Sequence, residues 1–231
     1  MSVYHNRRWD GDFLTVRSLL DANLLGHLST FESHFDRFRP EVQQRWREQD
    51  LPGSGILYDL GSHLIDQALC LFGKPQTVTA DLRAERQDAA ATDYFHLMLG
   101  YDRLRVILHS GSLVKHAGAR FALHGDKGSF TKYGLDPQEN RLKQGERPGA
   151  PDWGMDDPER YGQLTTTIGG LSLQAVVETM PGRYSDYYEE LAASIRSGHK
   201  PPVSAEEARA VIRVIECAVL SGRERRTVDF T

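Results

Sequence analysis

The sequence predicts an α+β fold, in which helices pack on one face of a largely antiparallel open sheet. Strand-like runs follow one another between residues 76 and 133, and short turns such as Asp102-Arg103 and Gly125-Asp126-Lys127-Gly128 separate them, which favours antiparallel hairpins. Apolar stripes at helical spacing lie before and after this series. The 231 residues are enough for one substantial core, and we expect a single domain over residues 1–231.

The first third of the chain is predicted to hold two helices with a strand between them. Apolar spacing predicts a helix over Asp10–Ala22, and alternation over His27–Phe38 suits a strand with one buried face. A central helix follows and ends at Gly73. Its apolar stripe consists of Leu57, Leu60, Leu64, Ala68 and Leu71.

The rest of the chain is predicted to form strands and then two helices. A polar, Pro- and Gly-rich segment over Asp136–Tyr161 predicts a long excursion over the surface. Gly169-Gly170 predicts a hairpin, and Ser204 opens the last helix with a capping box. The predicted strands are Gln76–Arg86, Asp93–Tyr101, Leu104–Ser112, Arg120–His124, Ser129–Tyr133, Thr165–Ile168 and Leu171–Thr179, and the predicted helices are Tyr184–Ser197 and the segment after Ser204.

Composition excludes several classes of partner. The net charge of -4 and the pI near 6.1 favour neither nucleic acid nor an anionic membrane. No apolar stretch approaches the length of a membrane span. Cys70 and Cys217 each lie in an apolar run of helical period, where a small buried side chain is expected. We therefore expect a soluble protein of the reducing cytoplasm.

Asp59, His63 and Asp66 share one face of the central helix, at i, i+4 and i+7. A solvated polar face is the ordinary interpretation. The rest of the helix is apolar over a wide arc, so we expect this strip to line a cleft. A histidine beside a carboxylate in a cleft can keep its pKa near neutrality, as general acid/base catalysis requires.

A metal site is the second interpretation of the same residues, with His34, His96 or His109 of the sheet completing the ligands of Asp59 and His63. The chain has no HExxH or CxxC pattern, and strand histidines that alternate with apolar residues are more often ordinary sheet-face side chains. We therefore expect no metal.

Arginines gather between the first strand and the central helix. The stretch carries Arg37, Arg39, Arg45 and Arg47, interleaved with Phe38 and Trp46. A hydrated loop is one interpretation, and a floor for a carboxylate, phosphate or hydroxyl-rich ligand is the other. No GxGxxG follows a predicted strand, so no dinucleotide site is visible.

The chain carries four distinctive motifs, which are Val3–Asp10, Glu32–Pro40, Tyr58–Gln67 and Lys132–Glu139. Together they resemble the glucose-fructose oxidoreductase/inositol dehydrogenase/MocA family, in the branch that includes NADP-dependent scyllo-inositol dehydrogenases. The resemblance spans essentially the whole chain and implies that it corresponds to the C-terminal domain alone, with the N-terminal Rossmann domain and its glycine-rich and Glu-Lys-Pro motifs absent. Two copies of the chain are then expected to pair through the open sheet face and form a homodimer.

The resemblance also implies a reaction and roles for residues. His63 would exchange the proton of a sugar or polyol hydroxyl, and Asp59 would hold the ligand and the imidazole. NAD(P) would be bound by the preceding domain, with no cofactor-binding residue in this chain, which alone would be inactive. The alternative is a non-catalytic module for sugar binding or dimerisation. The residues assigned to substrate binding are Asn6, Arg37, Arg39, Trp46, Tyr58 and Tyr133.

Overall fold

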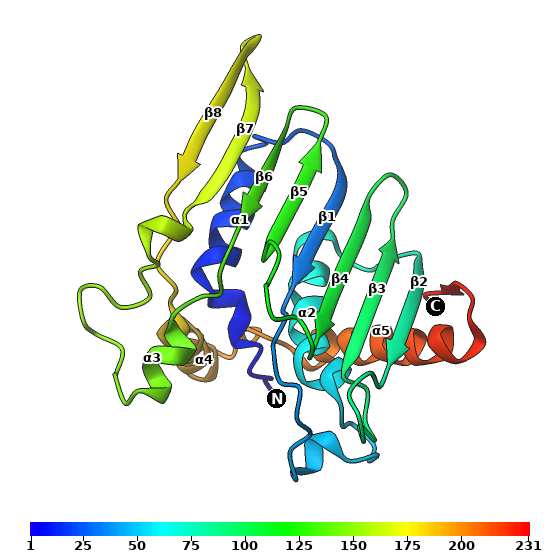
Figure 1. Ribbon diagram of the computed structural model, residues 1–231. Coiled ribbons are helices and arrows are strands. Elements are labelled where there is room, and N and C mark those ends of the chain that lie inside the picture. The colour runs from blue at the N-terminus through cyan, green and yellow to red at the C-terminus, as the bar shows by residue number, and fades with distance from the viewer.

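A nine-stranded sheet forms the centre of the computed structural model, which describes residues 1–231 (Figure 1). The strand order is β8-β7-β6-β5-β1-β4-β3-β2-β9. The strands are β1 (Leu28–His34), β2 (Thr77–Arg83), β3 (Tyr94–Gly100), β4 (Arg105–Gly111), β5 (Phe121–Gly125), β6 (Gly128–Lys132), β7 (Gly162–Ile168), β8 (Leu171–Val177) and β9 (Val228–Asp229).

Strand β1 lies between β5 and β4 and is parallel to β4, whereas every other neighbouring pair is antiparallel. The largely antiparallel sheet is thus confirmed. Local turn signals did not predict the parallel pair, because β1 and β4 are not consecutive strands. A helix and two other strands lie between them in the chain, which gives the long connection that a parallel pair requires.

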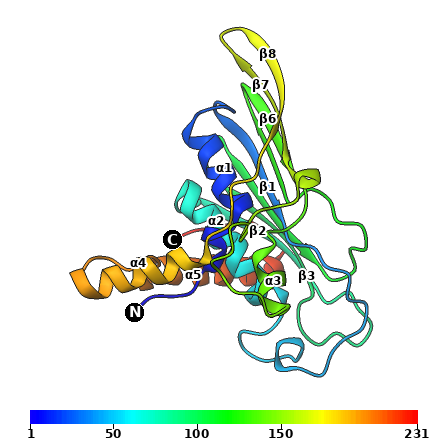
Figure 2. The same ribbon diagram turned by 90° about the vertical axis from the view of Figure 1, so that its left-hand side faces the viewer.

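Helices lie on one side of the sheet, as Figure 2 shows. The main core holds 28 buried residues from the sheet and these helices, among them Phe31, Phe95 and Ile215. Tyr94, His96 and Met98 alternate with the buried positions of β3 and lie on the other face. The helices are α1 (Gly11–Asp21), α2 (Ser62–Phe72), α3 (Gln138–Lys143), α4 (Tyr184–Ser197) and α5 (Ala205–Glu224).

The central helix does not begin as a regular α-helix. Residues Leu57–Gly61 form one turn of π-helix, and α2 continues from Ser62 to Phe72. The predicted stripe is buried as far as Ala68, while Leu71 is only partly buried. A π turn widens the backbone and changes the direction of its side chains, so Asp59 is displaced from the even spacing of an α-helix.

The prediction for Asp136–Tyr161 was wrong in part. The segment contains α3 and a 3-10 turn (Pro158–Arg160), and it buries Asp136, Gln138, Trp153 and Asp156. Gln138 anchors it, since its amide donates to the Trp9 carbonyl and its oxygen accepts from the Tyr184 backbone. The polar composition of the segment did not predict these hydrogen bonds, because their partners are far away in the sequence.

Cysteine burial was also predicted only in part. Cys217 is buried on α5, but Cys70 is exposed near the end of α2, where the helix turns it away from the sheet. Both thiols are free. No helix has the length and apolarity needed to cross a membrane.

Candidate functional site

A cavity of about 500 Å³ lies where the start of the chain, the arginine-rich segment, the π turn and α3 meet. It contains five of the residues predicted from sequence, which are Asn6, Arg37, Arg39, Asp59 and His63. A smaller cavity of about 230 Å³ is lined by Trp46 and Tyr58, and it shares Arg47, Asp59 and His63 with the first. The two form one polar hollow, which we call the His63 cleft.

The Asp59 carboxylate lies between two arginines of the preceding loop. Its Oδ2 is 3.5 Å from Nη1 of Arg37, and its Oδ1 is 3.6 Å from Nη1 of Arg47. It makes no hydrogen bond to His63, so its oxygens are directed to the guanidinium groups and not to the imidazole. The basic stretch is thus part of the cleft and not merely a hydrated loop.

His63 is held as a neutral imidazole. Burial, with the positive charge of Arg7 and the neighbouring His5, lowers its pKa from 6.5 to about 3. The expectation of a pKa near neutrality was therefore wrong, because burial and the positive charge of Arg7 outweigh the nearby carboxylate of Glu139. Nδ1 is buried and has no hydrogen-bond partner, whereas the ring borders both cavities of the cleft.

Arg7 is the main residue of the cleft that the sequence did not reveal. Its side chain is 6% exposed, and its guanidinium pairs with Asp10 and Glu139 and lies 4.6 Å from the centre of the Phe35 ring. Glu139 in turn pairs with Lys143 of α3. Arg7 and Glu139 lie within the motifs that resemble the family, and that was the one signal available.

A glycine turn before the π turn was also missed. Gly53 and Gly55 both have positive φ and line the smaller cavity. A Cβ on Gly55 would come within 2.9 Å of the Thr92 carbonyl oxygen. The Gly53-Ser54-Gly55 spacing directly before a helix was the signal for this close approach.

Two residues of the predicted strip and site lie elsewhere. Asp66 is 2% exposed, forms an ion pair with Arg8 and lines a different cavity of about 730 Å³ between α2 and α5. Tyr133 is exposed and lines neither part of the His63 cleft. The proximity of Asp59 to His63 therefore does not extend to Asp66.

His63 and Asp59 do not meet any strand histidine in a group of possible metal ligands. The one group of three metal-ligating side chains in the chain is His34, Asp36 and His109, without any residue of the cleft. Those histidines lie on the exposed face of the sheet, away from the helices.

The residues present do not fit the pyrophosphate of a dinucleotide. Gly125-Asp126-Lys127-Gly128 joins β5 to β6 and opens no helix. A Cβ on Gly125 would lie 2.2 Å from the Leu25 carbonyl oxygen, so this glycine allows the chain to pack against itself.

Known proteins are similar to this chain over almost its whole length. The model of the oxidoreductase family, C-terminal alpha/beta domain, matches residues 17–230. Scyllo-inositol 2-dehydrogenase (NADP(+)) of Bacillus subtilis is 49% identical over 228 residues, which are 99% of this chain and 64% of that relative. An uncharacterized oxidoreductase of Escherichia coli is also 49% identical, over 99% of this chain and 65% of its own length.

Solved structures show the same fold. An oxidoreductase from Bacillus subtilis superposes with a TM-score of 0.96 at 48% identity, over 100% of this chain and 66% of that one. An oxidoreductase from Yersinia pestis gives 0.93 at 46% identity, over 100% and 64%. The chain thus spans slightly less than two thirds of these relatives, and it belongs to the glucose-fructose oxidoreductase/inositol dehydrogenase/MocA family as its C-terminal alpha/beta domain.

Proposed function

We propose that these residues form the substrate-binding and proton-transferring half of an NAD(P)-dependent oxidoreductase that acts on a hydroxyl of a sugar or an inositol-like polyol. The observation that carries the proposal is the His63 cleft, in which a neutral imidazole lies beside a carboxylate held by two arginines. The similarity to the Bacillus subtilis relative, an NADP-dependent scyllo-inositol 2-dehydrogenase, supports the substrate class. The cytoplasmic location stays a prediction.

His63 would receive the hydroxyl proton. Its ring is neutral at ordinary pH, and its low pKa makes it a weak base that would hold the proton only briefly. Nε2 would accept the proton, since Nδ1 is the buried nitrogen. An imidazolium formed there would face the positive charge of Arg7, which disfavours keeping the proton. The proton would then pass from His63 to solvent, and the ring would return to its neutral form.

Asp59, Arg37 and Arg47 would bind and orient the substrate. Vicinal hydroxyls of a polyol can donate to a carboxylate and accept from guanidinium groups at the same time. Trp46, which is exposed, would provide an apolar floor for a sugar ring on the side of the smaller cavity. Asn6 and Arg39 line the larger cavity and would bind further hydroxyls.

The substrate class can be tested in a protein in which a nicotinamide-binding domain precedes these residues. Purified protein is assayed with scyllo-inositol, myo-inositol and an acyclic polyol, each with NADP+ and NAD+. We expect cofactor reduction with at least one cyclic polyol. Reduction with none of them, in a protein that still binds the cofactor, would contradict the proposed substrate class and favour the non-catalytic module.

We also propose that two copies pair through the uncovered face of the sheet. This face carries Met98 and Ile107 between its polar side chains, and the outer strand β8 exposes Val176 on the same face. In Figure 1 the β7–β8 hairpin projects beyond the rest of the sheet. Apolar groups on an open sheet are ordinarily covered by a partner.

A further inference from the structure

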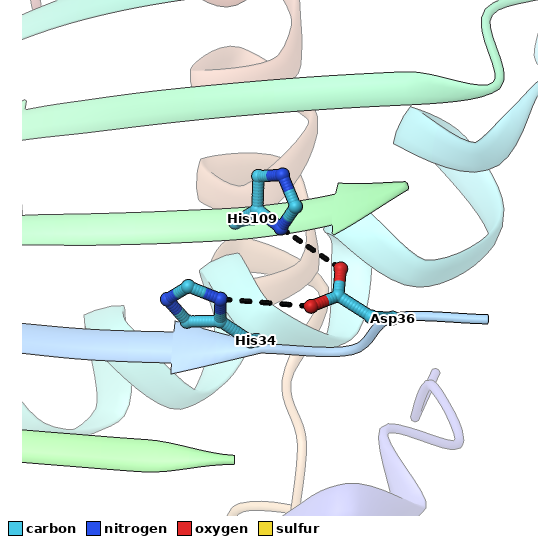
Figure 3. Close-up of side chains that lie close together, drawn as sticks. All are labelled: His34, Asp36 and His109. Carbon is cyan, nitrogen blue, oxygen red and sulfur yellow. Dashed lines mark ion pairs between the residues drawn. The ribbon is translucent and has the colours of Figure 1, made fainter. Parts of the chain in front are cut away.

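The uncovered face of the sheet carries a compact group of metal-ligating side chains where β1 ends. His34 and His109 are register partners in the parallel pair β1–β4, and so their side chains lie on the same face. Asp36 follows His34 by two residues and turns its carboxylate toward both rings (Figure 3). We propose that His34, Asp36 and His109 bind one divalent transition-metal ion, with Zn²⁺ as the best match.

The distances suit a small, tetrahedral ion. Oδ1 of Asp36 is 2.8 Å from Nδ1 of His109, and Oδ2 is 3.6 Å from Nδ1 of His34. One ligand atom from each residue lies within 4.8 Å of the other two. Ligands at about 2.0–2.1 Å from a tetrahedral Zn²⁺ are roughly 3.3 Å apart, so small rotations of the two rings would complete the arrangement.

The ring of His109 already directs one nitrogen at the Asp36 carboxylate. This nitrogen, Nδ1, is buried and lies 2.8 Å from a carboxylate oxygen. In the metal-free chain this nitrogen pairs with the carboxylate through the ring's proton, as the 2.8 Å distance indicates. A bound divalent cation would displace that proton and take both atoms as ligands.

The surrounding groups hold the ligands in place. The backbone N–H of Gly111 donates to Oδ1 of Asp36 at 3.1 Å, and the Asp36 side chain is only 5% exposed. Oε2 of Glu32 is 3.5 Å from Nε2 of His34, on the far side of that ring from Asp36. A carboxylate at one ring nitrogen of a histidine favours the tautomer with the proton on that nitrogen, which leaves the other nitrogen free to bind the metal.

Nitrogen and carboxylate ligands in this number point to Zn²⁺ and its neighbours in the first transition row, and not to Mg²⁺ or Ca²⁺, which prefer oxygen. Three protein ligands leave a fourth position for water. Because Asp36 directly precedes Arg37, an ion here would also fix the start of the loop that carries arginines into the His63 cleft. The sequence alone had predicted no metal, since Asp36 was not recognised as lying between the two histidines.

The test is calorimetric titration of the chelator-treated chain with ZnCl₂, together with the visible absorption of bound Co²⁺. We expect one equivalent to bind, and His34→Ala, His109→Ala and Asp36→Asn each to weaken binding by at least about tenfold. His96→Ala is the matched control, because its ring lies next to His109 on the same face but outside the ligand group. This variant should bind as the unchanged chain does.

Circular dichroism first establishes that each variant is folded, and Zn²⁺ should raise the melting temperature of the unchanged chain but not of His109→Ala. Three results would overturn the proposal. The first is that the unchanged chain does not bind Zn²⁺. The second is that His109→Ala binds Zn²⁺ as tightly as the unchanged chain, and the third is that His96→Ala weakens binding as much as the changes at the three ligands do. None of these measurements uses oxidoreductase activity, so their outcome is separate from that of the proposed function.

Discussion

Arg8 holds Asp66 through two nearly parallel hydrogen bonds, with Nε 2.8 Å from Oδ2 and Nη2 2.7 Å from Oδ1. Arg8 also donates to the Pro202 carbonyl and to Glu207. The pair therefore ties the start of the chain to α2 and to the beginning of α5. Asp66 thus has a structural role through Arg8.

Asp66→Asn should accordingly reduce stability. The change leaves a partly buried Arg8 without its carboxylate, and we expect a loss of about 2 kcal/mol or more in the free energy of unfolding. Urea unfolding measures the loss. Asp59→Asn is the control, since its carboxylate lies in the open cleft at longer distances from its arginines and should change stability by less than about 1 kcal/mol. Equal stability of the two variants would contradict the structural role of Asp66.

His63 should make folding sensitive to acid. Its pKa is about 3 in the folded chain and 6.5 without the fold, so between these values the unfolded state binds a proton that the folded state excludes. This stabilising contribution is complete above pH 6.5 and falls with pH, by up to about 1.4 kcal/mol per pH unit.

Urea unfolding between about pH 7 and 4 tests the His63 contribution. His63→Gln removes the titrating group, so this variant should lose less stability on acidification than the unchanged chain, while every other group cancels in the comparison. His199→Gln changes an exposed histidine and should follow the unchanged chain. Parallel curves for the unchanged chain and His63→Gln would show that the fold does not keep His63 neutral.

The sequence predicted most of the elements, because helical stripes and strand alternation are local. The site was only partly predictable, since its contacts join distant segments. Asp59, His63, Arg37 and Arg39 were identified from spacing and composition, and they do line one cleft. The π turn at Leu57–Gly61 and the parallel pairing of β1 with β4 have no local signature, and they decide that Asp59 meets arginines and that His34 meets His109.

The 231-residue chain by itself should bind neither NADH nor NADPH measurably and should not oxidise polyols. No glycine turn in it opens a helix after a strand in the way a pyrophosphate requires. Calorimetric titration with both cofactors measures this. Micromolar affinity for either would mean that a cradle exists in this fold, and the Gly53-Ser54-Gly55 turn would be the first place to look for it.

The chain should be a homodimer that pairs through the uncovered sheet face. Light scattering at tens of micromolar, a concentration chosen for ordinary interfaces, should give about twice the monomer mass of 26.0 kDa. Met98→Glu places a charge in the middle of this face and should yield monomers. Ile195→Glu alters the 76% exposed apolar side chain of α4 and should leave the dimer intact. A 26.0 kDa particle from the unchanged chain, or loss of the dimer only in Ile195→Glu, would contradict this interface.

The turnover of His63→Ala tests the central claim most directly, in a protein that carries a nicotinamide-binding domain ahead of these residues. A positioned base contributes about 10²–10⁴-fold, and so kcat should fall by that factor while the affinity for the cofactor stays nearly unchanged. Asp59→Asn should lower kcat less and raise KM, because it orients substrate, and Asp66→Asn should have the smallest effect of the three. Near-normal kcat in folded His63→Ala, together with loss of activity in folded Asp66→Asn, would contradict the assignment of proton transfer to His63.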